Sequence, residues 1–496
     1  MISFSVRADT DSHLATGTAE TDAMITVQAR EDGTAGSRSP DYAEVIIIDC
    51  SGSMATPRSK LDAARQAACA AVDSLRPGTL FAVIRGSSIA RTVYPPEGGL
   101  VRATEQTRAD ARRLVQQVEA GGGTAIGRWL LAARDLFAEH PDAFRHAILL
   151  TDGKNEHETA AAFRAALAAC QGRFQCDSRG VGRGWVAAEL TAVSDALLGS
   201  ARDVADPADL VEDFQRMTVA AMARARPEIS LRVWVPRHAR ISLFKQVTPT
   251  ISDLLDHARP VGALESEFPT GAWRAERRTY HLTISDLRPR TSTEPCRLAR
   301  VAVVSGDEVL ASNDVKAVWT SEPTLYSRRS RQAEYSRATI LLETAFTRGT
   351  EALRRGDSGN AADHLSRARG LAYDLGDDTK IEMLDQLLQP DPVTGRVRIR
   401  PGIDPHDLEV FDVRSRYTRP ARPREPAPGA GAGPGAGAVT RRPRSRAGLP
   451  PAERLVHRPG AVAARRADRT PRPRGAAGRD HPPSGRRHLR RTHRAA

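Results

Sequence analysis

The sequence of 496 residues has no run of about 18 apolar residues, the length that a helix needs to cross a bilayer. Its N-terminus, MISFSVRADTDSHLATG, lacks the basic start and apolar stretch of a secretion signal. We therefore expect neither a membrane span nor a secretion signal, and a cytoplasmic location. The chain is also too long for one core, which stops growing near roughly 250–300 residues, so we expect two or three domains.

Cysteine is scarce, and the five cysteines are widely spaced, at positions 50, 69, 170, 176 and 296. They are too few and too scattered for a disulfide scaffold or a zinc site with four thiolates. Their odd number fits reduced thiols. His146 and the adjacent pair His157 and Glu158 are potential zinc ligands, but the pair has no third ligand at short spacing. We expect His146 at the surface end of a strand and His157 with Glu158 in a solvated loop.

Positive charge is concentrated in one part of the chain. The 73 basic and 60 acidic residues give a net charge of +13, which by itself suggests a nucleic-acid or anionic-membrane partner. Residues 414–496, however, contain 22 arginines, no lysine and four acidic residues, a net charge of +18, so residues 1–413 carry −5. The body of the protein is therefore mildly acidic.

The segment 414–496 is rich in Arg, Pro, Gly and Ala, a composition that predicts a disordered tail. Three interpretations stay open. The tail could bind nucleic acid nonspecifically through counterion release, act as a solvated linker, or derive from a GC-rich gene read out of frame. Tyr417 is its single stacking residue, so base-specific binding of single strands is not expected.

Residues 42–224 alternate between strand and helix patterns. The runs VIIIDC and AILLTD are apolar on both faces, which indicates a parallel sheet covered by helices on both sides. We therefore predict a doubly wound, Rossmann-like α/β domain with a mostly parallel sheet. Helical spacing is found over residues 60–75, 104–118, 126–138, 159–169, 186–198 and 208–224.

The flanking segments predict other structures. Short alternating stretches such as TYHLTI and RLARVAVVS over residues 227–320 are typical of an antiparallel β-sandwich. Residues 1–41 contain two or three strands that cannot bury a core alone, so we expect them to pair with the sandwich. The α/β domain would then be an insertion between sandwich strands.

Helical periodicity returns over residues 333–389, with a Gly-Asp turn and small residues such as Ala361 and Ala368 at the expected crossing points. This segment resembles one tetratricopeptide-type hairpin. A single repeat is not stable alone, so we expect a helical pair packed on the sandwich. The stretches GRVRIRP and DLEVFDV predict short strands over residues 390–413.

Polar side chains follow the buried strands of the predicted parallel sheet. Asp49, Ser51 and Ser53 come directly after the first strand, Thr124 follows a run of three glycines before a helix, and Asp152 follows the strand HAILLT. Ligands of such sheets bind beyond the carboxyl ends of the strands, where these segments converge. Carboxylate and hydroxyl oxygens are the donors that Mg²⁺ or Mn²⁺ prefers. The sequence therefore predicts a metal site.

These five residues resemble the metal-ion-dependent adhesion site of von Willebrand factor type A domains, a D-x-S-x-S loop with a distant Thr and a distant Asp. The resemblance covers about residues 42–224, and every motif position is filled. It implies that Ser51, Ser53 and Thr124 offer hydroxyls to the metal, while Asp49 and Asp152 act largely through bound water. An acidic residue of a protein partner would complete the coordination, because such domains are chiefly adhesion and assembly modules.

The wider layout, with a sandwich and a helical segment around the α/β domain, looks like a group of intracellular actinobacterial proteins of this type. The loop after Asp152 should border the metal. We expect its side chains to contact the partner: Lys154, Asn155, Glu156, His157 and Glu158.

Enzymatic alternatives find less support in the sequence. An aspartate-dependent phosphatase of the haloacid dehalogenase type needs a second carboxylate two residues after Asp49, where this chain has Ser51. Neither a phosphate-binding G-x-x-x-x-G-K-[ST] loop nor a G-x-S-x-G elbow is present. We expect a non-enzymatic module without catalytic residues. A metal-dependent hydrolase using the same cluster is the alternative, with a base from Glu156, His157 or Glu158.

Overall fold

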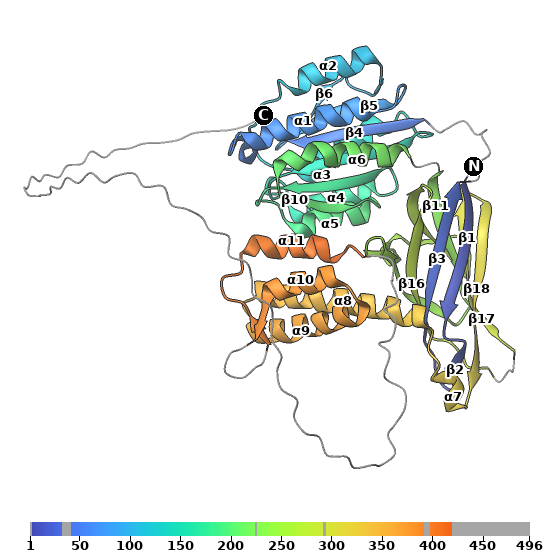
Figure 1. The fold of residues 1–496 in the computed structure, drawn as a ribbon. Coiled ribbons are helices and arrows are strands. Elements are labelled where there is room, and N and C mark those ends of the chain that lie inside the picture. The colour runs from blue at the N-terminus through green and yellow to red at the C-terminus, as the bar shows by residue number, and fades with distance from the viewer. Residues whose placement is uncertain (1, 32–40, 224–225, 291–293, 391–396, 419–496) are drawn as a thin grey trace, which may run out of the picture. The chain divides into compact units, whose positions relative to one another are not determined.

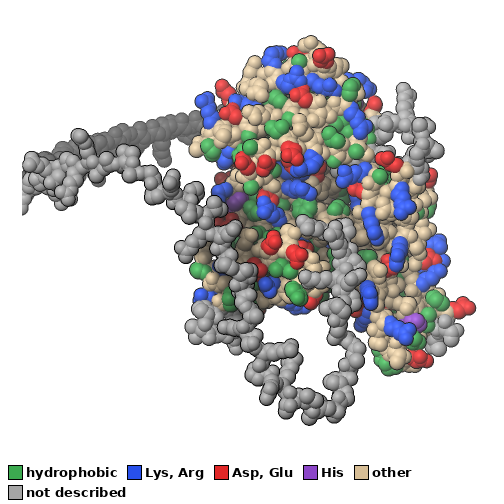
Figure 2. Space-filling model, viewed as in Figure 1, with side chains coloured by type: hydrophobic (Ala, Val, Ile, Leu, Met, Phe, Trp, Pro, Cys, Tyr) green, Lys and Arg blue, Asp and Glu red, His purple; other side chains and the backbone are tan. Residues whose placement is uncertain are grey.

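The computed structural model describes residues 2–31, 41–223, 226–290, 294–390 and 397–418 (Figure 1). The described residues belong to one compact unit, which contains an α/β domain, a β-sandwich and a helical part. None of the helices in the described ranges is both long and apolar enough to cross a membrane. All five cysteines are free thiols. On the face shown in Figure 2, acidic and basic side chains are intermingled.

The α/β domain is built on a sheet with the strand order β10-β9-β8-β4-β5-β6. Its strands are parallel except for the antiparallel edge strand β6 and the short β7, which pairs with β5. The strands are β4 (Tyr42–Asp49), β5 (Leu80–Gly86), β6 (Ala90–Tyr94), β7 (Val101–Arg102), β8 (Phe144–Thr151), β9 (Gln175–Val181) and β10 (Ala201–Val204). This confirms the predicted mostly parallel sheet.

Helices cover both faces of this sheet, which is why β4 is apolar on both sides. Ile46 and Ile48 pack in the core with α1, α2 and α6, whereas Val45 and Ile47 face α3, α4 and α5. The helices are α1 (Ser59–Ser74), α2 (Glu105–Val115), α3 (Ile126–Phe137), α4 (Ala160–Cys170), α5 (Ala187–Ala196) and α6 (Leu210–Met222), with short 3₁₀ turns η1 (Gly52–Ala55) and η2 (Pro207–Asp209).

The sandwich consists of two sheets with the orders β1-β3-β16-β12-β13 and β14-β15-β11-β17-β18-β2. The N-terminal strand β3 pairs with β16 along eight residues, and β2 pairs with β18. The α/β domain is therefore inserted between β3 and β11. The strands are β1 (Ile2–Thr10), β2 (His13–Ala15), β3 (Thr21–Glu31), β11 (Arg226–Trp234), β12 (Arg240–Thr248), β13 (Ser252–Asp253), β14 (Arg259–Pro260), β15 (Glu265–Trp273), β16 (Arg277–Ser285), β17 (Cys296–Ser305) and β18 (Glu308–Thr320), with the 3₁₀ turn η3 (Leu255–His257).

The helical part follows the sandwich. Its elements are α7 (Pro323–Tyr326), α8 (Arg331–Arg354), α9 (Ser358–Leu375), α10 (Asp378–Leu387), the paired strands β19 (Leu388–Pro390) and β20 (Val397–Ile399), and α11 (Pro405–Ser415). At the crossing of α8 and α9, Ala361 and Ala368 are buried and Gly349 lies against Leu365. Small residues at these positions let the two helix backbones approach each other.

The strand predicted for DLEVFDV is wrong, because these residues form the middle of α11. Asp404 caps the helix by accepting a hydrogen bond from the backbone nitrogen of His406 (2.9 Å), and Pro405 occupies its first turn. Leu408 and Phe411 are buried on one side at helical spacing. The helix-capping residues therefore favour a helix more strongly than the alternation of apolar residues favours a strand.

Residues 414–418, which we call the clamp, were expected to begin the tail but connect the α/β domain to the sandwich. Arg414 pairs with Asp203 (2.7 Å), and the Tyr417 hydroxyl donates to the carbonyl of Ala201 (2.7 Å). On the sandwich side, the backbone nitrogen of Ile251 donates to the carbonyl of Arg416 (2.8 Å). The rest of the predicted tail, residues 419–496, lies outside the described residues.

Candidate metal centre

Asp49 is the last residue of β4 and is fully buried at the carboxyl edge of the sheet. Its Oδ1 accepts a hydrogen bond from the backbone nitrogen of Ser51 (2.7 Å), and its Oδ2 accepts one from the hydroxyl of Thr151 (2.7 Å). Burial raises the pKa of Asp49 to about 6, and the charge of Asp152 acts in the same direction. A cation at this edge would favour the ionised carboxylate.

A chain of hydrogen bonds joins the D-x-S-x-S loop to the end of β8. The hydroxyls of Ser51 and Ser53 lie 2.9 Å apart, and that of Ser53 donates to Oδ1 of Asp152 (2.6 Å). The backbone nitrogen of Gly52 donates to the carbonyl of Gly122 (2.9 Å), which ties this loop to the three glycines before Thr124. The short side chains and these bonds hold the oxygens together.

Thr124 reaches the same edge from the loop that precedes α3. A methyl group built on Gly153 would lie 3.4 Å from the hydroxyl oxygens of both Ser53 and Thr124, so these two hydroxyls flank Gly153. The backbone of Thr124 exchanges two hydrogen bonds with His157, one through Nδ1 (3.1 Å) and one through the backbone nitrogen (2.9 Å). All five residues of the sequence motif therefore lie at one edge of the sheet.

Two further side chains of this edge were not found from the sequence. Thr151 orients Asp49, and Lys60 in the first turn of α1 places Nζ 2.7 Å from Oδ2 of Asp152. Thr151 directly precedes Asp152, and α1 follows the D-x-S-x-S loop, so both positions could have been deduced from the predicted elements. The hydrogen-bond partners could not, because they depend on how the loops fold.

Two residues of the loop after Asp152 have structural roles. Asn155 accepts a hydrogen bond from the backbone nitrogen of Ile126 (2.8 Å), and Glu158 accepts one from that of Gly127 (2.6 Å). These bonds satisfy the first turn of α3, whose own N-cap, an alanine, offers no side-chain acceptor. The backbone nitrogen of Asn155 donates to Glu189 of α5 (3.0 Å).

The remaining members of this loop are Lys154, Glu156 and His157. All three side chains are exposed, but Nδ1 of His157 accepts a hydrogen bond from the backbone nitrogen of Thr124. Lys154 and Glu156 are therefore the side chains of this loop that are available to a partner.

The predicted surface position of His146 is wrong. The side chain is buried within the sheet, with Nδ1 2.8 Å from Glu44 and Nε2 3.1 Å from Asp177 on the two neighbouring strands. Burial alone would lower the pKa of His146, but the two carboxylates outweigh this effect and raise it to about 9. His146 is therefore a buried partner of two acids on neighbouring strands, which the pattern of a single strand could not show.

The donor set at the sheet edge consists of two carboxylates and three hydroxyls. In the part of the chain that the structure describes, no group of three or more His, Cys, Asp or Glu side chains is placed to hold a metal. A site here would thus depend on hydroxyls and water as well as on carboxylates. Such hard oxygen donors fit Mg²⁺ or Mn²⁺ rather than a metal that prefers thiolate or imidazole.

The chain resembles known proteins both in sequence and in structure. The family model for the von Willebrand factor type A domain matches residues 45–155. An uncharacterised protein of Synechocystis sp. is 26% identical over 220 residues, which cover 42% of this chain and 49% of that protein. The chain thus spans about half the length of this curated relative.

Two solved structures match most of the chain. That of a von Willebrand factor type A protein from Catenulispora acidiphila is 38% identical, with a TM-score of 0.80, and the match covers 84% of this chain and 97% of that one. That of the ArnB paralogue VWA2 from Sulfolobus acidocaldarius is 15% identical, with a TM-score of 0.53 and coverage of 84% and 98%. The second match shows the fold alone.

Proposed function

The chain belongs to the von Willebrand factor type A family, and from this we propose that it is a non-enzymatic module that binds an acidic protein partner through a divalent ion. One observation carries the proposal: a continuous set of hydrogen bonds gathers Asp49, Ser51, Ser53 and Asp152 at the carboxyl edge of the sheet. The short polar side chains converge from separate loops, as a cation site requires.

In this proposal Mg²⁺ or Mn²⁺ is held by the hydroxyls of Ser51, Ser53 and Thr124, with Asp49 and Asp152 acting largely through water. A carboxylate of the partner supplies the remaining ligand, because a hard cation gains most from an acidic oxygen. The exposed side chains of Lys154 and Glu156 would then contact the partner around the metal and contribute to selectivity.

The surroundings of the cluster favour binding over hydrolysis. A hydrolase needs a side chain that is free to accept a proton from a metal-bound water. Glu158 instead accepts a hydrogen bond from the first turn of α3, and Nδ1 of His157 accepts one from the backbone of Thr124. These side chains hold the site in shape, which leaves Glu156 as the remaining base of that loop.

The first test measures the metal alone. Titration calorimetry with Mg²⁺ and Mn²⁺ should show one site in the full chain, weakened by roughly tenfold or more in Asp152→Asn and Asp49→Asn, because each variant removes a charge next to the ion. Asp135→Asn, which removes an exposed carboxylate on α3 (67% exposed), should bind like the wild type. Unchanged affinity in both site variants would exclude the metal site.

The second test addresses the partner. Affinity capture from a lysate should recover a partner with Mg²⁺ and lose it both in chelator and with Asp152→Asn. Recovery of the same partner in chelator would separate binding from the metal. A phosphate-ester turnover that requires Mg²⁺ and disappears in Asp152→Asn would support the hydrolase instead.

A further inference from the structure

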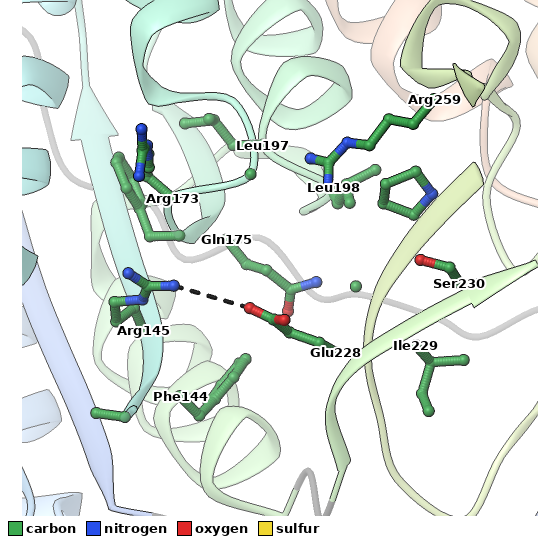
Figure 3. A pocket seen from close by; sticks show the side chains of 15 residues that line it. Phe144, Arg145, Arg173, Gln175, Leu197, Leu198, Glu228, Ile229, Ser230 and Arg259 are labelled. Carbon is green, nitrogen blue, oxygen red and sulfur yellow. Dashed lines mark ion pairs between the residues drawn. The ribbon is translucent and has the colours of Figure 1, made fainter. Parts of the chain in front are cut away.

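A hollow lined by apolar and basic side chains lies at the other end of the same sheet, where the starts of β8 and β9 face β11, β14 and β15 of the sandwich (Figure 3). It has a volume of about 120 Å³. The eight residues of β8 separate it from the candidate metal centre by about 23 Å, at roughly 3.3 Å per residue. The two sites therefore share no residue.

Basic side chains from both domains line this hollow. Arg145 and Arg173 come from the α/β domain and Arg259 from the sandwich, and Glu228 is the one acidic residue among the lining side chains. The three guanidinium groups and one carboxylate give the lining a net charge of +2. This charge matches a dianion.

The positive charge of Arg145 is largely buried, and no close anionic side chain within the described ranges compensates for the loss of its hydration. Its side chain is 15% exposed, and its ion-pair partner Glu228 lies 3.8 Å away, beyond hydrogen-bond distance, with a side chain that is 82% exposed. Such a pair is screened by water and contributes little. Among the residues that the structure describes, neither Arg173 nor Arg259 forms an ion pair. Guanidinium donors at the hollow thus lack a strong anionic partner.

The two domains fit closely at the walls of the hollow. Gly172 of the α/β domain lies against Arg259 of the sandwich, and a methyl group built on Gly172 would lie 2.6 Å from Nη2 of that arginine. In the reverse direction, a methyl group on Gly271 of the sandwich would overlap the amide of Gln175. Each domain therefore places a polar side chain against a glycine of the other.

We propose that this hollow binds a phosphate group, inorganic or on a small ester, through Arg145, Arg173 and Arg259. The planar guanidinium group presents paired donors that match phosphate oxygens, and charged hydrogen bonds of this kind are the strong ones. Because the arginines come from both domains, the bound phosphate ties the α/β domain to the sandwich. This function is separate from the metal-dependent binding proposed above.

Titration calorimetry of the full chain with inorganic phosphate at constant ionic strength tests the proposal. We expect one saturable site, weakened about tenfold or more by Arg259→Gln and by Arg173→Gln, since each variant removes a charged donor. Glu228→Gln should strengthen binding, because it removes the carboxylate that competes with phosphate. Parallel titrations with glycerol phosphate decide whether the free ion or an ester is preferred.

Arg164→Gln is the matched control, since it removes an exposed arginine of α4 outside the hollow. It should change the affinity less than twofold. Phosphate should also raise the thermal unfolding midpoint of the wild type and of Arg164→Gln more than that of Arg259→Gln. Absence of a saturable site in the wild type, or equal weakening by Arg164→Gln and Arg259→Gln, would overturn the proposal.

Discussion

Lys60 places a positive charge at the carboxylate that a divalent ion would also need. Its ammonium group lies 2.7 Å from Oδ2 of Asp152, and the side chain is 17% exposed. This contact places a positive charge beside the buried carboxylate of Asp152, and the same charge would repel a divalent ion bound at the proposed site. We therefore predict that Lys60 lowers the affinity of the proposed site for a metal.

Replacement of Lys60 by Met should tighten Mg²⁺ binding by about three- to tenfold, because a positive charge near the ion costs on the order of 1 kcal/mol at a partly exposed site. The measurement is calorimetric titration with Mg²⁺. Lys154→Met removes an exposed lysine of the loop after Asp152 and should have a smaller effect. Weaker Mg²⁺ binding in Lys60→Met would show that the lysine orients Asp152 rather than competing with the ion.

The meeting of Asp49 and Asp152 at one edge of the sheet could be predicted from the sequence. Apolar runs locate the strands, and the carboxyl ends of parallel strands meet at one edge, so Asp49 and Asp152 had to approach each other. The partners of His146 could not be predicted. Glu44 lies opposite it in the register of β4 and β8, and strand register is a property of the folded sheet.

At the scale of elements, the helical hairpin contains one close approach, between Gly349 of α8 and Leu365 of α9. A methyl group on Gly349 of α8 would lie 2.5 Å from Cγ of Leu365 in α9, whereas one on Gly370 of α9 would have no neighbour within 4 Å. The two glycines occupy helices of the same hairpin. They therefore allow the effect of crowding to be separated from that of helix propensity.

Gly349→Ala should destabilise the protein by about 1–3 kcal/mol, because Leu365 has to move in a packed interface. Gly370→Ala should be neutral or stabilising by up to about 1 kcal/mol, since alanine favours the helix and meets no obstacle. Urea unfolding followed by circular dichroism measures both. Equal effects of the two substitutions would mean that the crossing of α8 and α9 can relax.

Helix positions could be predicted where apolar periodicity was long. The spacing predicts helices over residues 60–75 and 126–138, and the structure has them at Ser59–Ser74 and Ile126–Phe137. The segment that became α11 is shorter and its apolar residues also fit alternation. There the capping by Asp404 and the packing of Leu408 decide the structure.

At the scale of the whole molecule, the clamp connects parts that are far apart in the sequence. Net charge alone places the start of the tail at residue 414, but Arg414 and Arg416 pair with Asp203 and Asp195 of the α/β domain. Composition gives no sign of these contacts, because an arginine in an ion pair and an arginine in a tail look alike in a sequence. The clamp residues therefore belong to the folded part of the chain.

A chain that ends at Val413 should differ from one that ends at Thr418 in its protection against hydrogen exchange. The backbone nitrogen of Ile251 donates to the carbonyl of Arg416, so its exchange should be slow in the longer chain and faster in the shorter one. Amides inside β4 should be protected equally in both. Equal protection of Ile251 would show that the clamp contributes little to joining the domains.

The insertion of the α/β domain has a consequence for how such proteins arise. Tyr42, at the start of β4, and Ala221, near the end of α6, pack in one small cluster with Ala272 of the sandwich. Chain entry and chain exit thus lie next to each other. A recombination event in the gene that replaces the segment between these two junctions would transplant a complete domain with its own binding edge, and every strand of the recipient sandwich would keep its neighbours.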